Sequence, residues 1–467
     1  MSVLATPSGR RRPRGPLLRR TIPAADGESW PHVLILGGGF AGANAVLGLR
    51  DARVRVTLVD RHVYKVFQPL LYQVATAGLN SGDVTMVLRS LSLQATNMRY
   101  LQGEVVDIDA AHDCVRIDRG GQDPEVLTYD YLVIANGATT TFFGTPGAEE
   151  FSLPMYTRAQ ALAIRNRIFA ELERTSSVAE VDRLCVSVVG GGPTGVEIAG
   201  ALADFRTAEL DILYPELPPG ALQISVIQRG PDLLKEFDQE IRDYAAETLE
   251  DRGVILRRGK GVKSVGYDYV ELDDGEIVES DVTIWAAGVA IDERVARWNL
   301  PQTERGRLQV DDHLQVTGIP NVFAAGDIAA GPTPLPQLAQ PAIQEGRHVA
   351  KEIAARVAGR HHEKPFRYKD LGTMATIGRR AAVADIPWLP IDLTGTLGWI
   401  GWMGVHVSKL LGRRNRRAVT MNLLSLYAGT RSTRQPNPVM GDVDSIAAAH
   451  AFDRHAEDRK FGPGARG

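Results

Sequence analysis

One pattern, a buried strand that runs directly into glycines and then into a helix, occurs twice in this sequence. The first copy follows the apolar run 33–36 and reads Gly37-Gly38-Gly39-Phe40-Ala41-Gly42. The second follows the run 184–189 and reads Gly190-Gly191-Gly192-Pro193-Thr194-Gly195. Glycines at these positions let the backbone approach a pyrophosphate, and the helix N-terminus supplies N–H groups and a positive dipole for its charge. The two loops predict an α/β fold with two Rossmann-type dinucleotide-binding domains.

The residue that ends the strand after each loop differs between the two copies. The strand 54–59 ends at Asp60, about twenty residues after the glycines, which is the spacing of an acid that hydrogen-bonds a ribose hydroxyl. The strand 224–227 ends instead in Gln228-Arg229. Gln228 has no negative charge to repel a 2′-phosphate and Arg229 could pair with one, so NADPH is a candidate beside NADH.

Three further strand segments fit an FAD-binding unit that the second unit interrupts. They are 129–135, followed by Asn136-Gly137-Ala138; 282–287, followed by Gly288; and 321–325, followed by Gly326-Asp327. The carboxylate of Asp327 can accept hydrogen bonds from the hydroxyls of a ribityl chain. We therefore expect an FAD-binding domain at 31–153 and 291–359, with an NAD(P)H-binding domain inserted at 154–290.

The region 360–434 has no further glycine loop and carries an amphipathic pattern. Apolar and aromatic side chains fall on one face of an expected helix, and basic ones follow; these are Trp399, Trp402, Met403, His406 and Leu410, then Lys409, Arg413, Arg414, Arg416 and Arg417. The pattern predicts helices that lie on an anionic membrane through residues near Trp399 to Arg417. The uncharged stretch 393–408 is shorter than the roughly twenty residues that span a bilayer. The alternative is a helix packed into a domain or dimer interface.

Composition excludes several classes of protein. With 467 residues, 44% hydrophobic content and a net charge of −3, the chain predicts globular domains and no recruitment of nucleic acid. Its two cysteines, Cys114 and Cys185, are too far apart in sequence for a Cys-x-x-Cys site, so we expect no disulfide framework, no metal and a reducing compartment. The Arg-rich residues 1–30 predict a disordered basic tail, either simply solvated or drawn to an anionic membrane, and 435–467 a flexible tail.

Taken together, these residues resemble the type II, non-proton-pumping NADH dehydrogenases, the NADH:quinone oxidoreductases of the two-dinucleotide flavoprotein superfamily. The resemblance runs from about residue 31 to 434. Beyond the glycine loops, it is carried by the segments 67–75 (FQPLLYQVA), 284–289 (IWAAGV), 323–327 (FAAGD), 339–346 (AQPAIQEG), 368–372 (YKDLG) and 412–416 (GRRNR).

The resemblance implies roles for named residues. It places Gln340 and Gln344, one helical turn apart, beside the flavin and the quinone pocket, and Glu197 near the flavin and the nicotinamide. The alternatives are two solvated glutamines and a buried structural glutamate. The residues expected to bind FAD are Gly37, Gly39, Phe40, Ala41, Gly42, Asp60, Asn136, Gly137, Asp327 and Gln340. Those expected to bind NAD(P)H are Gly190, Gly192, Pro193, Thr194, Gly195, Glu197, Gln228, Arg229 and Gly288.

The resulting hypothesis is an FAD-dependent enzyme that passes a hydride from NAD(P)H to the flavin and two electrons on to a membrane quinone. The resemblance favours NADH, a peripheral position on the cytoplasmic side of the cell membrane, and allows a homodimer. Two alternatives stay open: an NADPH-preferring quinone or ferredoxin-type reductase, and a non-catalytic flavin redox sensor. Disulfide reductases, sulfide:quinone oxidoreductases and Cys-dependent oxidases are disfavoured because neither cysteine lies beside an expected flavin contact.

Overall fold

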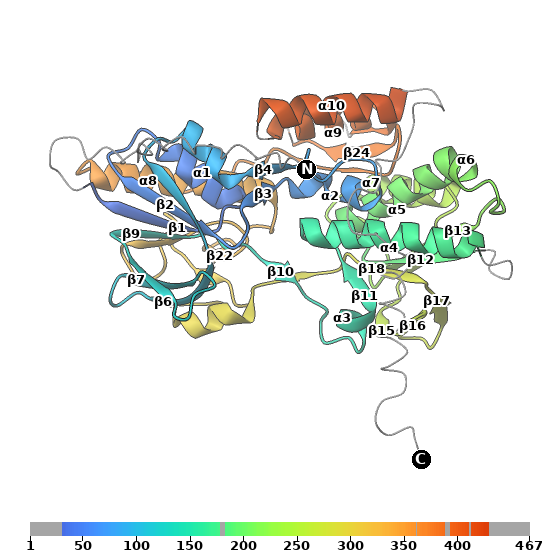
Figure 1. Cartoon of the computed structure of the whole chain (residues 1–467), viewed down its shortest axis with the longest axis horizontal. Helices are drawn as coiled ribbons and strands as arrows, with labels where there is room; N and C mark the ends of the chain where they lie inside the picture. The colour runs from blue at the N-terminus through green and yellow to red at the C-terminus, as the bar shows by residue number, and fades with distance from the viewer. Residues whose placement is uncertain (1–29, 178–182, 361, 388–392, 411, 429–467) are drawn as a thin grey trace, which may run out of the picture.

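Two parallel five-stranded sheets, each beside its own glycine loop, form the centres of two lobes that lie side by side (Figure 1). The computed structural model describes residues 30–177, 183–360, 362–387, 393–410 and 412–428. The first sheet has the order β21-β9-β1-β2-β5, and all its neighbouring strands are parallel. Its strands are β1 (His32–Leu36), β2 (Arg55–Asp60), β5 (Met98–Gln102), β9 (Tyr131–Ile134) and β21 (Val322–Ala324).

The second sheet repeats this plan with the order β11-β18-β12-β13-β14. Its strands are β11 (Ser152–Pro154), β12 (Leu184–Val189), β13 (Leu222–Gln228), β14 (Ile255–Arg258) and β18 (Val282–Trp285). Every residue of β12 is buried, which explains its unbroken apolar run, since a parallel strand is covered on both faces. The two α/β domains expected from the loops are present.

One domain boundary and the grouping of one strand segment need correction. Because β11 pairs with β18, the expected boundary at 153/154 cuts through a strand of the second sheet. Ala148, just before β11, also packs with Val189 and Trp285 of the second lobe. The segment 282–287, which we grouped with the FAD unit, contains β18 and belongs to the second sheet, in agreement with the expected range 154–290. A buried strand looks the same in sequence whichever of two neighbouring parallel sheets it joins.

Helices cover both sheets. The first loop leads into α1 (Phe40–Gly48), the second into α5 (Pro193–Phe205), and α8 (Ala339–Val357) packs along α1. A Cβ on Gly346 would overlap the carbonyl oxygen of Ala41, so a glycine is required where α8 crosses α1. The other main helices are α2 (Leu71–Ala75), α4 (Arg158–Ser177) and α7 (Gln239–Asp251). The close crossing fixes the N-terminal half of α8 beside the first glycine loop.

Smaller elements decorate and connect the lobes. The short ribbon of β10 (Thr139–Thr140) and β19 (Val289–Ala290) runs between them (Figure 1). The other small sheets are β3 (Tyr64–Val66) with β4 (Thr85–Val87); β6 (Glu104–Asp109), β7 (Cys114–Asp118) and β8 (Glu125–Thr128); β15 (Val262–Val265), β16 (Tyr269–Leu272) and β17 (Ile277–Glu279); and β20 (Leu308–Gln309) with β22 (Ala329–Ala330). The short helices are α3 (Ala148–Phe151), α6 (Asp211–Leu213), 3-10 turns at Gln68–Leu70, Leu88–Leu93 and Glu293–Trp298, and a π turn at Arg206–Leu210.

The C-terminal region forms a small antiparallel sheet and two helices that lie along one side of the molecule. The sheet contains β23 (Thr373–Thr376), β24 (Ala382–Asp385) and β25 (Leu393–Thr394), and the helices are α9 (Gly395–Lys409) and α10 (Arg413–Ala428). In Figure 1, α9 and α10 lie on top of the second lobe and extend toward the first. Asn415 on α10 donates a hydrogen bond to the Thr85 carbonyl at 2.5 Å. The region therefore contacts both lobes.

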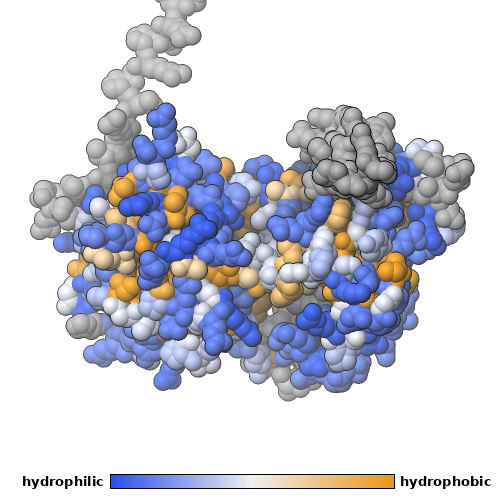
Figure 2. Space-filling model, turned by 90° about the horizontal axis from the view of Figure 1, so that it is seen from below, coloured by the Kyte–Doolittle hydropathy of each residue, from blue (hydrophilic) through white to orange (hydrophobic). Residues whose placement is uncertain are grey.

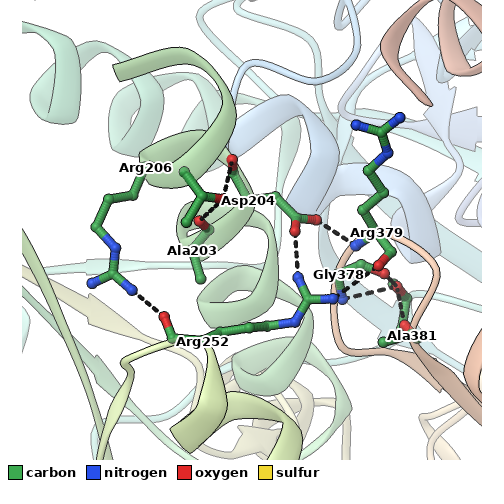
Figure 3. A network of polar contacts seen from close by, with 9 residues as sticks. Ala203, Asp204, Arg206, Arg252, Gly378, Arg379 and Ala381 are labelled. Carbon is green, nitrogen blue, oxygen red and sulfur yellow. Dashed lines mark hydrogen bonds and ion pairs between the residues drawn. The ribbon is translucent and has the colours of Figure 1, made fainter. Parts of the chain in front are cut away.

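A polar network attaches this region to the second lobe (Figure 3). The carboxylate of Asp204, on α5, accepts a hydrogen bond from the backbone N–H of Arg379 at 2.5 Å and forms an ion pair with Arg252. Arg252 donates to the carbonyl of Arg379 at 2.8 Å. The turn between β23 and β24 is thus held by both partners of one ion pair.

The face of α9 that we expected to meet lipid is its inward face. Trp402 and Leu410 are each only 1% exposed, and His406 stacks on Trp402 with ring centroids 4.3 Å apart. Trp399 and Met403 are partly buried against the same core. The periodicity correctly indicated an apolar helical stripe, but a stripe against protein and a stripe against lipid have the same pattern in sequence. The packed-helix alternative is correct for these residues. None of the helices that the structure describes is long and apolar enough to cross a membrane.

Candidate functional site

The first glycine loop is shaped by its own packing and by an opening for a ligand. Gly37 has a φ of +96°, and a Cβ on Gly42 would overlap the carbonyl oxygen of Gly37. A Cβ on Gly39, by contrast, would meet no protein atom within 4 Å. Internal packing therefore requires Gly37 and Gly42 but not Gly39, whose bare backbone at the start of α1 suits the close approach of a pyrophosphate.

The second loop reproduces these features. Gly190 has a φ of +111°, a Cβ on Gly195 would overlap the carbonyl oxygen of Gly190, and a Cβ on Gly192 would meet no protein atom within 4 Å. Pro193 and Thr194 begin α5, where the fixed φ of proline favours a helix start. The residues of both loops therefore fit a dinucleotide pyrophosphate by the same criterion.

The two residues that end the neighbouring strands have equivalent contacts. Asp60 accepts a hydrogen bond from the backbone N–H of Gly38 at 2.6 Å, and Gln228 accepts one from Gly191 at 2.9 Å. The amide of Gln228 thus keeps the loop contact without the charge. Arg229 is exposed and forms no ion pair within the described part of the chain. Asp60 and Gln228 end β2 and β13, which is where an adenosine ribose would approach each unit.

The carboxyl ends of the parallel strands gather the other expected FAD contacts at one edge of the first sheet. Asn136 and Gly137 follow β9, and Asp327 follows β21, which is the neighbour of β9. The carboxylate of Asp327 accepts a hydrogen bond from the Tyr156 hydroxyl at 3.5 Å, and burial raises the pKa of Asp327. In the second lobe, Gly288 follows β18 beside the loop at Gly190 in the same way.

Two charged residues near the first loop escaped the sequence analysis. Glu345, on α8, accepts a hydrogen bond from the backbone N–H of Gly326 at 2.5 Å, and burial raises its pKa to about 7. Lys65 lies 6% exposed with its ammonium 4.2 Å above the ring of Phe40, and burial lowers its pKa to about 7. Neither belongs to a glycine loop, and although Glu345 lies in the segment 339–346, only the glutamines of that segment were singled out. Perturbed pKa values of this kind concentrate at functional sites.

The two glutamines of α8 have different environments. Gln344 accepts from the backbone N–H of Lys369 at 3.0 Å and donates to its carbonyl at 2.9 Å, so both ends of the amide hold the segment after α8. Gln340 lies half-buried in the first turn of α8, close in sequence to the Gly326 contact of Glu345. The structure places both side chains on one helix, as expected. Their role beside a flavin or a quinone stays a prediction.

Glu197 is the most strongly perturbed acid of the expected set. It lies in the second turn of α5, 8% exposed, and the backbone N–H of Thr376 points at its carboxyl oxygen from 3.5 Å. Burial raises the pKa of Glu197 to about 8, an effect that Thr376 and the Trp402 indole only partly oppose. The C-terminal region thus covers Glu197, and this burial favours the protonated form of the carboxyl group.

The fold and these loops define a class: a two-dinucleotide flavoprotein that uses FAD and NADH. Comparison with known proteins agrees. Residues 31–346 match the pyridine nucleotide-disulphide oxidoreductase family, and residues 371–431 match the NDH2 C-terminal domain. The chain belongs to the type II NADH:quinone oxidoreductases.

Similar proteins span most of the chain. It is 32% identical over 439 residues to the type II NADH:quinone oxidoreductase Ndh of Mycobacterium tuberculosis, covering 91% of this chain and 93% of that protein. It is 35% identical over 404 residues to NdhA of the same organism, covering 83% and 85%. The structure of NDH2 from Plasmodium falciparum in complex with NADH superposes with a TM-score of 0.79 and 23% identity, covering 88% of this chain and 100% of that one.

Proposed function

We propose that this chain oxidises NADH at FAD and passes the electrons to a membrane quinone without moving protons across the membrane. The observation that supports this most strongly is the pair of loops in which Gly39 and Gly192 leave two separate helix N-termini accessible to a pyrophosphate. Thiol chemistry is disfavoured because Cys185 lies buried within β12, where burial raises its pKa to about 11 and keeps it protonated.

FAD, when bound, supplies the redox chemistry by accepting a hydride and releasing two electrons. The chain's residues bind and orient the reactants. The N-termini of α1 and α5 would hold the two pyrophosphates, Asp60 and Gln228 fix the loops, and Asp327 would be available to the ribityl hydroxyls. Glu197 holds a proton at the junction of the second lobe and the C-terminal region, and Gln340 and Gln344 are our candidates for placing the flavin and the quinone.

Steady-state oxidation of NADH by the FAD-loaded protein with a soluble quinone analogue tests the function. We expect turnover with parallel double-reciprocal plots, because in a ping-pong reaction the oxidised nicotinamide leaves before the quinone is reduced. A flavin-loaded preparation that is reduced by NADH but does not turn over would favour the redox sensor, and one that NADH cannot reduce would contradict both readings. Replacing the quinone analogue with a ferredoxin tests the remaining alternative.

Cofactor choice depends on Gln228, and we propose that NADH and NADPH are both accepted. Gln228→Glu keeps an oxygen that can accept from Gly191 but adds a charge facing the position of a 2′-phosphate. We expect the ratio of kcat/KM for NADH over NADPH to rise about tenfold, which corresponds to about 1.4 kcal/mol of repulsion. Arg229→Gln is the companion variant and should lower kcat/KM for NADPH alone. Ratios that are unchanged in both variants would contradict this assignment.

We propose that the outward face of α9 and α10 contacts an anionic membrane, on the cytoplasmic side of the cell membrane. Its apolar side chains are Leu397, Ile400, Met421 and Leu424, which are 69%, 57%, 65% and 50% exposed. The exposed cations Lys409, Arg413, Arg414, Arg416 and Arg417 lie on the same two helices. Figure 2 shows the face turned away from α9 and α10, where apolar residues form separate patches on a mainly hydrophilic surface. A homodimer stays a prediction.

Substituting the outward apolar residues should release the protein from membranes without unfolding it. We combine Leu397→Gln, Ile400→Gln and Met421→Gln in one variant. It loses the partial burial of three apolar side chains in the membrane, which is worth about 3 kcal/mol of binding free energy, so binding to anionic vesicles should weaken about 100-fold. Leu93→Gln, an 80% exposed leucine on the first lobe, is the matched control. Truncation after Gly395 is a poorer test because it also removes the buried Trp402. Unchanged vesicle sedimentation of the triple variant would contradict this surface.

A further inference from the structure

Four side chains that could bind a metal ion meet at the middle of α8, on the first lobe. His348 and Glu352 lie one turn apart on α8, His313 lies in the loop after β20, and His362 lies in the segment that follows α8. One ligand atom from each lies within 4.8 Å of all the others. The oxygen Oε1 of Glu352 is 2.7 Å from Nδ1 of His313, 2.8 Å from Nδ1 of His362 and 3.6 Å from Nε2 of His348.

The four ligand atoms lie close enough together to surround a small tetrahedral cation. Zn²⁺ binds imidazole nitrogen and carboxylate oxygen at about 2.0–2.2 Å, which puts ligand atoms in a tetrahedron roughly 3.3 Å apart. The distance from Glu352 to His348 is close to that value, whereas the contacts of Glu352 with His313 and His362 are hydrogen bonds that would lengthen by about half an ångström when an ion binds. Hydrogen bonding alone leaves the cluster incomplete, because the buried Nε2 of His348 has no hydrogen-bond partner. An orphaned imidazole nitrogen that faces a carboxylate and two other imidazoles is a second indication of a ligand.

We propose that His313, His348, Glu352 and His362 form a zinc site. Four protein ligands close the coordination sphere, so the site is structural and leaves no position for a substrate. The carboxylate of Asp312 lies 3.9 Å from the other ring nitrogen of His313 and adds a negative charge beside that ligand. The site uses no residue of either glycine loop. Our expectation of no metal considered only the two cysteines, and His348-x-x-x-Glu352 on a helix is the sequence signal that it overlooked.

The site would join three segments beside the candidate quinone region. Gln344, one turn before His348 on α8, holds the backbone of Lys369, and His362 lies in the same segment seven residues earlier. A zinc ion would therefore fix the start of this segment as Gln344 fixes its end. The cavity of about 530 Å³ that borders Gln344, His348 and His362 is partly lined by this segment. We infer that the ion positions the connection from α8 to the C-terminal region.

Metal binding by the full-length, FAD-loaded protein tests the proposal. After treatment with a chelator, titration with Zn²⁺ should show one equivalent bound, and Co²⁺ should give the intense visible absorption of tetrahedral coordination. His362→Asn and Glu352→Gln should each weaken Zn²⁺ binding about 100-fold or more. His112→Asn is the matched control, because His112 is exposed and its contact is with Asp109.

The outcomes separate a metal site from a hydrogen-bonded cluster. Zn²⁺ should also raise the unfolding temperature of the unmodified protein and of His112→Asn, but not that of His362→Asn, whose substitution lies outside any helix or strand. Flavin content and circular dichroism should be equal among these variants. Absence of stoichiometric binding, or binding that His362→Asn and Glu352→Gln leave unchanged, would overturn the proposal.

Discussion

Gly195→Val is expected to abolish reduction of the protein by NADH while leaving FAD bound. A side chain at this position would overlap the carbonyl oxygen of Gly190, which is backbone and cannot rotate away, so the second loop must open. Loss of the oriented N–H groups around a pyrophosphate should lower kcat/KM for NADH by a factor of about 1,000, or about 4 kcal/mol. FAD binding should persist, because the first sheet packs in a core of its own.

The equivalent change in the first lobe should prevent binding of FAD instead of binding of NADH. Gly42→Val would overlap the carbonyl oxygen of Gly37 and should yield protein without flavin. Gly192→Ala completes the set: its methyl group meets no protein atom, so the fold should be unchanged while NADH binds more weakly. The ratio of flavin to protein absorbance and the stopped-flow rate of flavin bleaching by NADH distinguish the three variants. A Gly195→Val protein that NADH reduces at the unmodified rate would exclude the second loop as the nicotinamide site.

The features that were predicted well from the sequence are those determined by contacts between residues close together in the chain. Within each glycine loop, close contacts between nearby residues explain why glycine is required: Gly42 packs on Gly37, and Gly195 packs on Gly190. The order of strand, turn and helix can therefore be predicted from neighbouring residues. The pairing of Asp60 with one loop follows from the regular spacing of a βαβ unit. The type II family was also identifiable from short segments, and the comparisons confirm it.

The features that sequence predicted poorly depend on what packs against a segment. The stripe of Trp402 and Leu410 is apolar whether it meets lipid or protein, and only the core beneath α9 decides that it faces inward. The boundary at 153 was misplaced because β11 joins its sheet through β18, far away in sequence. The cluster around Glu352 brings His313 and His362 together from positions forty-nine residues apart. Only the spacing of His348 and Glu352 on α8 is a local signal of that cluster. The remaining information lies in segments that are distant in the sequence.

Glu197→Gln is expected to make the protein more stable at alkaline pH. Burial raises the pKa of Glu197 to about 8 in the folded chain, above the ordinary value near 4.5, so the folded state binds the extra proton between these values. Stability that this proton supports is complete below about pH 4.5 and is lost as the pH rises toward 8. The full pKa shift corresponds to roughly 4 to 5 kcal/mol of folding free energy. Glu197→Gln has no proton to release here, so its stability should not fall in this way.

Urea unfolding of the FAD-loaded protein between pH 5 and 9 measures this effect. The stability of Glu197→Gln relative to the unmodified chain should increase steadily with pH, whereas Glu171→Gln should destabilise at pH 8, because Glu171 is a buried acid paired with Arg167 and Arg174. Parallel stability curves for Glu197→Gln and the unmodified chain would contradict the raised pKa. Turnover adds a functional readout. If Glu197 supplies a proton to the quinone, kcat should fall as the pH rises through about 8, and this pH dependence must disappear in Glu197→Gln. If the fall of kcat near pH 8 persists in Glu197→Gln, Glu197 is only a structural contact of Thr376.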